Sequence, residues 1–253
     1  MTATSSAIVS PTERYADAEW GMRVDLAACY RLAHIYGMSK VVWNHITARL
    51  PSTDLILINR FGLRYDEITA SNLLTIDLDG NVIDGSPDEL NITGYVIHSA
   101  VHRARPDVVG VMHTHARGGR GVSALKCGLL PLSQEAMLFY EQLAYHDYEG
   151  LSDDEDERER LARNLGRMDQ MVLQNHGLLT VGRTIAETFW RMFQLEMACA
   201  HQMDVLASGQ EYIVPAPEVC RKARQQYLDD GPGRSEWPAL LRQLDRLCPD
   251  YAS

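Results

Sequence analysis

The stretch Val108-Val109-Gly110-Val111-Met112-His113-Thr114-His115 places two histidines at the end of an apolar run. The run is rich in β-branched residues and follows the turn signal Arg105-Pro106-Asp107, so the sequence predicts a buried strand here. Alternate residues of a strand face the same side. His113 and His115 can therefore present both imidazoles to one point.

A third histidine, His176, lies at a glycine turn between the apolar segments 171–173 and 178–181. A tight loop there can aim a third ring at the same point. Neutral imidazole suits zinc, iron, copper and nickel, and three protein ligands without a fourth describe an open, catalytic type of site. The alternative is that the His-x-His pair only ends a strand.

The composition narrows the class of protein. A chain of 253 residues with 45% hydrophobic residues suits one large α/β domain or two small ones. A formal net charge of −10 argues against nucleic acid or an anionic membrane as a partner. The five cysteines are scattered, which favours a reducing compartment over a disulfide framework. With no signal peptide visible and no apolar run long enough for a membrane span, we expect a cytoplasmic protein.

Periodicity and cap signals give an α/β order of elements. The segment Ser10-Pro11-Thr12-Glu13 has the signature of a helix start, and Gly37 is a plausible stop for that helix. Thr184 with Glu187 marks a second start, and Gly209 the end of that long helix. We also expect strands at 46–50, 55–59, 73–77 and 81–84, and helices at 91–104, within 118–124 and at 153–167. Residues 1–210 form one expected domain, with 211–253 as an extension that packs on it or on a neighbouring subunit.

These landmarks, in this order, resemble the class II aldolase/adducin family from about the first helix to Gln202. The most specific parts are Ile97-His98, the stretch from Arg105 to His115, and Asn175-His176-Gly177-Leu178-Leu179. The resemblance implies a three-layer α/β/α sandwich around a central, largely antiparallel sheet. It also implies one divalent transition metal per chain (Zn, Fe or Mn) on His113, His115 and His176, and commonly a homotetramer with active sites between subunits.

Two departures from the family concern the substrate. The acid/base glutamate of the sugar-phosphate aldolases lies nineteen positions before the first ligand, which is Gly94 here, and its two preceding serines fall on Ile92 and Thr93. The glycine-asparagine pair of the phosphate loop corresponds to Trp43-Asn44, where an indole would fill the phosphate space. We therefore expect no phosphate pocket and a missing or displaced base. A shifted alignment would put Asp88 or Glu89 at the base position.

Further candidates come from single residues. Trp43, Asn44 and Gln134 are candidate substrate contacts, and His146 is the candidate proton carrier because imidazole titrates near neutrality. Glu135 is an alternative base. The acids of 153–157 are expected to form a solvated helix start. His98 and His102, four apart on one helix face, have a spacing that can bind metal, but packed, hydrogen-bonded histidines are the favoured interpretation.

Together these features predict a metal-dependent lyase that breaks a C–C bond in a small unphosphorylated keto, hydroxy or aromatic acid. Decarboxylation is favoured over aldol chemistry, because CO2 leaves without a base. The first alternative is a three-histidine non-haem iron oxygenase acting on an aromatic keto or hydroxy acid. The second is a non-catalytic assembly module like adducin.

Overall fold

The computed structural model describes residues 15–85, 92–150 and 155–253, with the side chains of 92–94 and 155–156 left aside. None of the helices in these ranges is long and apolar enough to span a membrane. The elements in chain order are α2 (Asp17–Ile35), β1 (His45–Arg49), β2 (Ile56–Ile58), η1 (Tyr65–Glu67), η2 (Ala70–Asn72), β3 (Leu74–Ile76), α3 (Ile92–Ala104), β4 (Gly110–Thr114), α4 (Arg117–Ser123), α5 (Gln134–Leu138), β5 (Ala144–His146), α6 (Glu155–Leu165), β6 (Gln170–Leu173), β7 (Gly177–Gly182), α7 (Ile185–Ala207), α8 (Pro217–Asp230), α9 (Glu236–Leu247) and η3 (Pro249–Ala252).

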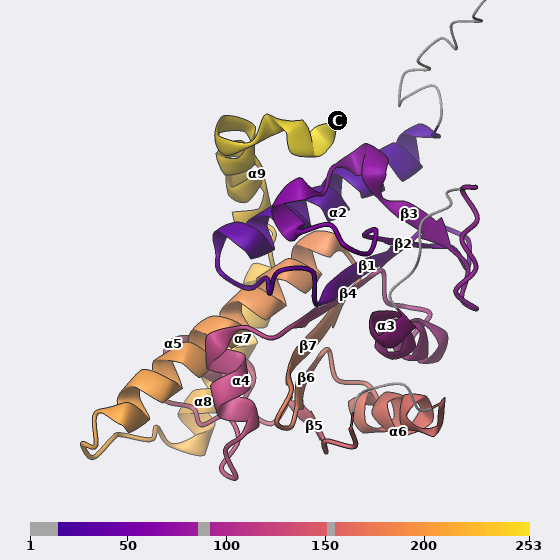
Figure 1. Ribbon diagram of the computed structural model, residues 1–253. Coiled ribbons are helices and arrows are strands. Elements are labelled where there is room, and N and C mark those ends of the chain that lie inside the picture. The colour runs from indigo at the N-terminus through magenta and orange to yellow at the C-terminus, as the bar shows by residue number, and fades with distance from the viewer. Residues whose placement is uncertain (1–14, 86–91, 151–154) are drawn as a thin grey trace, which may run out of the picture.

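The strands form one mixed sheet in the order β3-β2-β1-β4-β7-β6-β5, in which every neighbouring pair is antiparallel except β5 and β6. Helices α2, α4 and α7 lie over one face, and α3 and α6 lie over the other (Figure 1). The fold is thus the expected α/β/α sandwich with a largely antiparallel sheet.

Alternation along β4 sorts its side chains between the two layers. Met112 packs in the core on the α2 and α7 side, while Val111 packs in the core that α3 and α6 close. A strand repeats every two residues, so His113 shares the face of Val111. The first ligand candidate therefore points toward the layer of α3 and α6.

The helix boundaries follow the sequence signals in part. Helix α7 begins as predicted, because the Thr184 side chain accepts a hydrogen bond from the backbone N–H of Glu187. Helix α2 begins at Asp17 with Ala16 as its N-cap, so the cap signal at Ser10 does not start this helix and lies outside the described residues. The predicted stop at Gly37 is confirmed, since α2 ends at Ile35 and Gly37 has φ +71°.

The helix that the sequence predicts within residues 118–124 is α4, which begins one residue earlier, at Arg117. The Glu196 carboxylate on α7 accepts the backbone N–H groups of Gly118 and Gly119 at 2.6 and 2.7 Å and so caps the helix from outside. A Cβ on Gly118 would lie 2.5 Å from the Ala200 backbone nitrogen. The glycines here serve close helix packing.

The C-terminal segment packs on its own domain. Helix α8 contacts α5, and α9 contacts α2 and α7. The Trp237 indole donates to Asp25 at 3.3 Å, and Arg31 pairs with Asp250 at 2.6 Å. The division at residue 210 stays a prediction.

Candidate metal centre

The three histidines meet at the end of β4. His113 is in the strand, His115 follows it directly, and His176 lies in the short loop between β6 and β7. Their rings are 4.7 Å apart, centroid to centroid, in all three pairs. One nitrogen from each ring lies within 4.8 Å of the other two. We call these three residues the histidine triad.

The backbone fixes the third ring. Asn175 adopts φ +54°, a left-handed conformation that asparagine tolerates better than most residues, and its N–H donates to the Ser123 carbonyl at 2.9 Å. Behind the loop, a Cβ on Gly177 would lie 2.2 Å from the carbonyl oxygen of Thr114. The loop that carries His176 is therefore held against the strand end that carries the other two rings.

The triad is held in its neutral form. The His113 Nδ1–H donates to the Leu178 carbonyl at 2.9 Å, which leaves the Nε2 lone pair facing His115 Nε2, also 2.9 Å away. Burial, and then the neighbouring imidazoles, lower the pKa of His113 well below its usual value. Burial is also the first cause that lowers the pKa of His115 to about 3 and that of His176 to about 4.

These donors fit a divalent transition metal. Zinc–nitrogen bonds are about 2.0–2.1 Å long, so two ligand nitrogens at right angles or tetrahedral angles stand roughly 2.9–3.4 Å apart. The 2.9 Å between the two Nε2 atoms agrees with this spacing. Among the described residues, no other set of three or more histidine, cysteine or acidic side chains has this convergence.

The predicted substrate contacts Trp43 and Asn44 directly precede β1. The next residue, His45, is the cross-strand partner of His113, so this segment lies beside the triad. Asn44 is buried with φ +80°, and neither polar atom of its amide has a hydrogen-bond partner. The Trp43 ring is half exposed and lies 6.3 Å from the ring of Phe61.

Two cations lie near the triad. Lys40 and Arg120 are both exposed, and their positive charges help to lower the pKa of His115, after burial and the charge of His176. Neither forms an ion pair with the part of the chain that the structure describes.

Gln134 has a partner elsewhere. It starts α5 and donates its amide to the Tyr227 hydroxyl of α8 at 2.9 Å, so within this chain its amide faces the C-terminal segment. Its role as a substrate contact stays a prediction. The alternative bases Asp88 and Glu89 lie outside the described residues.

His98 and His102 belong to a second group of histidines, which also includes His45. The Thr47 hydroxyl lies between His98 Nδ1 at 2.8 Å and His102 Nε2 at 2.9 Å. His45 reaches Asn59 Oδ1 at 3.4 Å. The favoured interpretation of packed, hydrogen-bonded histidines agrees with this geometry. We call His45, His98 and His102 the second cluster.

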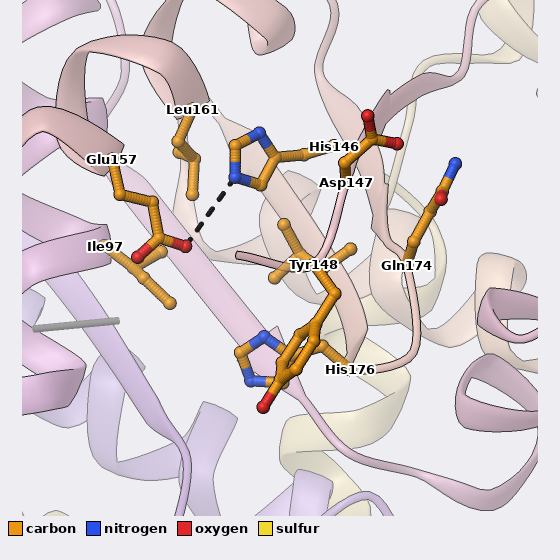
Figure 2. Close-up of a pocket in the computed structure, with 9 residues that line it drawn as sticks. Ile97, His146, Asp147, Tyr148, Glu157, Leu161, Gln174 and His176 are labelled. Carbon is orange, nitrogen blue, oxygen red and sulfur yellow. Dashed lines mark ion pairs between the residues drawn. The ribbon is translucent and has the colours of Figure 1, made fainter. Parts of the chain in front are cut away.

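The predicted proton carrier, His146, ends β5 and is buried. It lines a small pocket together with Tyr148, His176 and Glu157, and its Nε2 lies 3.6 Å from the Glu157 carboxylate (Figure 2). The Tyr148 ring is 6.4 Å from the ring of His176. The structure thus brings His146 to a pocket that borders the triad.

The expectation that the acidic run before α6 is solvated is wrong at Glu157. The acids of 153–157 were expected to form a solvated helix start, but the Glu157 side chain is only 8% exposed and faces His146. Leu161 and Leu165, four and eight residues later, are buried on the same face of α6. This spacing was the signal in the sequence that could have revealed the buried acid.

The family model described as "Class II Aldolase and Adducin N-terminal domain" matches residues 24–203. The chain belongs to the class II aldolase and adducin family. A crystal structure of an aldolase II superfamily protein from Pseudomonas syringae superposes with a TM-score of 0.92 at 44% identity, covering 97% of this chain and 100% of that one. An L-fuculose 1-phosphate aldolase from Glaciozyma antarctica PI12 superposes with a TM-score of 0.82 at 28% identity, over 94% and 95% of the two chains.

The similar proteins also include adducins. Alpha-adducin from Rattus norvegicus is 39% identical over 251 residues, which cover 92% of this chain and 34% of that protein. Within the aldolase-like fold, Gly94 lies in the first turn of α3, where the sequence alignment expects the aldolase glutamate. Family membership therefore does not fix the reaction of this chain, which has to be inferred from its own residues.

Proposed function

We propose that this chain is a metal-dependent lyase that breaks a C–C bond, by decarboxylation, in a small unphosphorylated keto, hydroxy or aromatic acid. The observation that carries the proposal is the convergence of three neutral ring nitrogens within 4.8 Å. His113, His115 and His176 would hold one divalent transition metal, Zn, Fe or Mn. When bound, the metal supplies a Lewis acid for adjacent substrate oxygens.

Residues around the triad suit an acid as substrate. Lys40 and Arg120 offer positive charge for a carboxylate. The Asn44 amide offers an unpartnered donor and acceptor for a keto or hydroxyl oxygen. Trp43 and Phe61 form a partly exposed aromatic pair that suits a planar or apolar substrate group.

Two residues argue against phosphorylated sugars as substrates. Trp43 stands where the family's phosphate loop has glycine, and Gly94 stands where the aldolases have their base. We expect kcat/KM for fuculose 1-phosphate or ribulose 5-phosphate below about 10⁴ M⁻¹s⁻¹, the lower end of ordinary enzymes. A coupled aldolase assay on metal-loaded protein measures this value, and faster turnover would contradict the argument from these two residues.

His146 takes part in returning a proton to the substrate carbon after CO2 leaves, and substitution by glutamine should lower kcat at least tenfold.

Two other functions are the alternatives to the lyase. A three-nitrogen site that holds iron would suit the oxygenase alternative, and the likeness to alpha-adducin favours an assembly module. For either function, as for the lyase, we propose a homotetramer in the cytoplasm.

Metal analysis of protein purified without chelator or added metal tests the proposal. We expect about one transition metal per chain in the wild type and almost none in the His113→Ala/His115→Ala double variant, with circular dichroism unchanged. His201→Ala, at an exposed histidine outside the triad, is the matched control. Metal retained in the double variant refutes the ligand assignment. A metal-free wild type favours the assembly module, and iron with O2 uptake on turnover favours the oxygenase.

A further inference from the structure

Two large aromatic side chains, Trp43 and Phe61, are half exposed. Trp43 is 50% exposed and Phe61 is 44% exposed. Their ring centroids lie 6.3 Å apart, with 60° between the ring planes, which is within the range of an aromatic pair. Each ring therefore keeps free surface on which a third ring can pack. We call these two residues the aromatic corner.

The sheet places the aromatic corner at the same end as the triad. Strand β1 runs antiparallel to both β2 and β4, so the start of β1 lies beside the ends of β2 and β4. Trp43 is two residues before His45, the first residue of β1, and Phe61 is in the loop that follows β2. His45 Nδ1 lies 3.4 Å from Asn59 Oδ1, so the two loops are joined there. The aromatic corner therefore borders the end of β4, where the triad is.

The turn before β1 holds Trp43 in a strained conformation. The Trp43 N–H donates to the Lys40 carbonyl at 2.9 Å and closes this turn. Within the turn, Val41 has φ +51°, which is an outlier for a β-branched residue, and its side chain is 65% exposed. Backbone strain of this kind is found most often at ligand-binding and active sites. The turn fixes the position of the indole before a ligand arrives.

The polar groups next to the aromatic corner suit the acid end of a ligand. Asn44, which joins Trp43 to β1, is 3% exposed, and both polar atoms of its amide lack a hydrogen-bond partner in the described part of the chain. A buried amide without partners is costly, so this one calls for a partner from outside the chain. Lys40 lies close enough to the triad for its charge to help lower the pKa of His115. A surface for a ring and polar groups for an acid thus adjoin.

We propose that the aromatic corner selects substrates by a planar ring, so that the substrate of this site is an aromatic 2-hydroxy or 2-keto acid and not an aliphatic one. The proposal rests on the proposed function and deepens it by naming the substrate class. The ring packs against Trp43 and Phe61, and the carboxylate and the hydroxyl or keto oxygen face the triad. Burial alone favours any apolar group of the right size, whereas edge-to-face packing against these two rings is available only to a third aromatic ring.

The first test compares three acids that share one head group and differ in the rest of the molecule: 3-phenyllactate, 3-cyclohexyllactate and lactate. One aromatic pair changes affinity about two- to tenfold beyond the effect of burial. By calorimetry on metal-loaded protein, we expect phenyllactate to bind at least about threefold more tightly than cyclohexyllactate and at least about tenfold more tightly than lactate. Trp43→Leu and Phe61→Leu should each reduce the preference for phenyl over cyclohexyl. Tyr212→Leu, at an exposed aromatic residue of the C-terminal segment, is the matched control.

The outcomes of this test are distinct. Equal affinities for the phenyl and cyclohexyl acids in the wild type, or no binding of any of the three acids, overturn the selection of an aromatic ring. A phenyl preference that survives in both leucine variants overturns the assignment to Trp43 and Phe61. A change of oligomeric state in Trp43→Leu, measured by light scattering, would show that the aromatic corner is an interface between copies of this chain, and it also overturns the proposal.

The second test observes the indole directly in metal-free protein. Nitrogen-15 NMR shows one indole N–H signal for each of the four tryptophans, and Trp43→Leu identifies that of Trp43. Saturating phenyllactate should shift this signal. The indoles of Trp190 and Trp237 donate hydrogen bonds inside the fold, so their signals should stay in place. A Trp43 signal that does not move overturns the proposal.

Failure of this proposal can be told from failure of the proposed function. Metal-loaded wild type that decarboxylates 2-ketobutyrate as fast as phenylpyruvate keeps the proposed function and overturns the aromatic substrate class. A wild type that takes up no metal contradicts the proposed function, whereas a shifted Trp43 signal in the same protein still supports the site for the ring. Faster decarboxylation of phenylpyruvate, lost in Trp43→Leu but not in Tyr212→Leu, supports both.

Discussion

The triad and the second cluster use the same residue type on the same face of the sheet, yet they differ in what their nitrogens meet. In the second cluster the Thr47 hydroxyl separates His98 from His102, and His45 turns to an amide oxygen. In the triad the rings turn toward one another. Burial lowers pKa values in both, so a perturbed pKa alone does not mark a metal site. Convergent lone pairs do.

Removal of the metal should give the largest difference between the two clusters. A ligand present at about a thousand times its Kd stabilises the folded state by about 4 kcal/mol, which for a chain of this size is roughly 8–16 °C in Tm. We expect a chelator to lower Tm by that order in the wild type and to leave the His113→Ala/His115→Ala variant unchanged. Equal responses in a calorimeter would mean that the triad holds no metal.

A substitution in the second cluster should lower the stability of the fold without removing metal. Thr47→Val keeps the shape of the side chain but leaves His98 and His102 with a buried nitrogen each and no hydroxyl partner. At about 1–3 kcal/mol for each of the two unsatisfied groups, the free energy of unfolding measured in urea should fall by about 2–6 kcal/mol. Metal content should stay near that of the wild type, and loss of metal in Thr47→Val would show that the two clusters act as one.

Lowering the pH should gradually remove the stability that the second cluster contributes to the fold. Burial lowers the pKa of His45 to about 4 and that of His102 to about 3, against about 6.5 in the unfolded chain. The unfolded state binds more protons below pH 6.5, so the stability from these neutral rings is complete above that pH and is lost as pH falls toward 4.

The expected slope is about 1.4 kcal/mol per pH unit for each histidine. Urea unfolding of metal-free protein at pH 7, 6 and 5 measures it, and His45→Gln should flatten the slope by about one such increment. His201→Gln, at an exposed position, serves as the comparison. A slope unchanged in His45→Gln would show that His45 is not buried as a neutral ring.

The sequence alone was sufficient for the triad, because strand alternation and a glycine turn are local rules that place His113, His115 and His176 without knowledge of the rest. The layers followed from the family resemblance. Other features depend on tertiary packing. Strand β5 forms because β6 lies beside it, and α4 starts early because Glu196 caps it from another helix.

Glu157 shows where reasoning from composition fails. A run of acids is ordinarily solvated, and which of its members turns inward depends on the face that α6 presents to the sheet. Leu161 and Leu165 marked that face in advance. Gln134 is the opposite case, since its partner Tyr227 is 93 residues away and no local pattern announces it.

The contact behind Gly177 has a consequence for the gene. A Cβ there would collide with the Thr114 carbonyl, and the collision would push apart the strand end and the loop that carry the triad. Every single-base change of a glycine codon that alters the amino acid introduces a Cβ or a chain stop. Selection on this protein should therefore be severe at a codon whose product has no side chain and takes no part in the chemistry, because the space that this glycine leaves empty is what the neighbouring carbonyl needs.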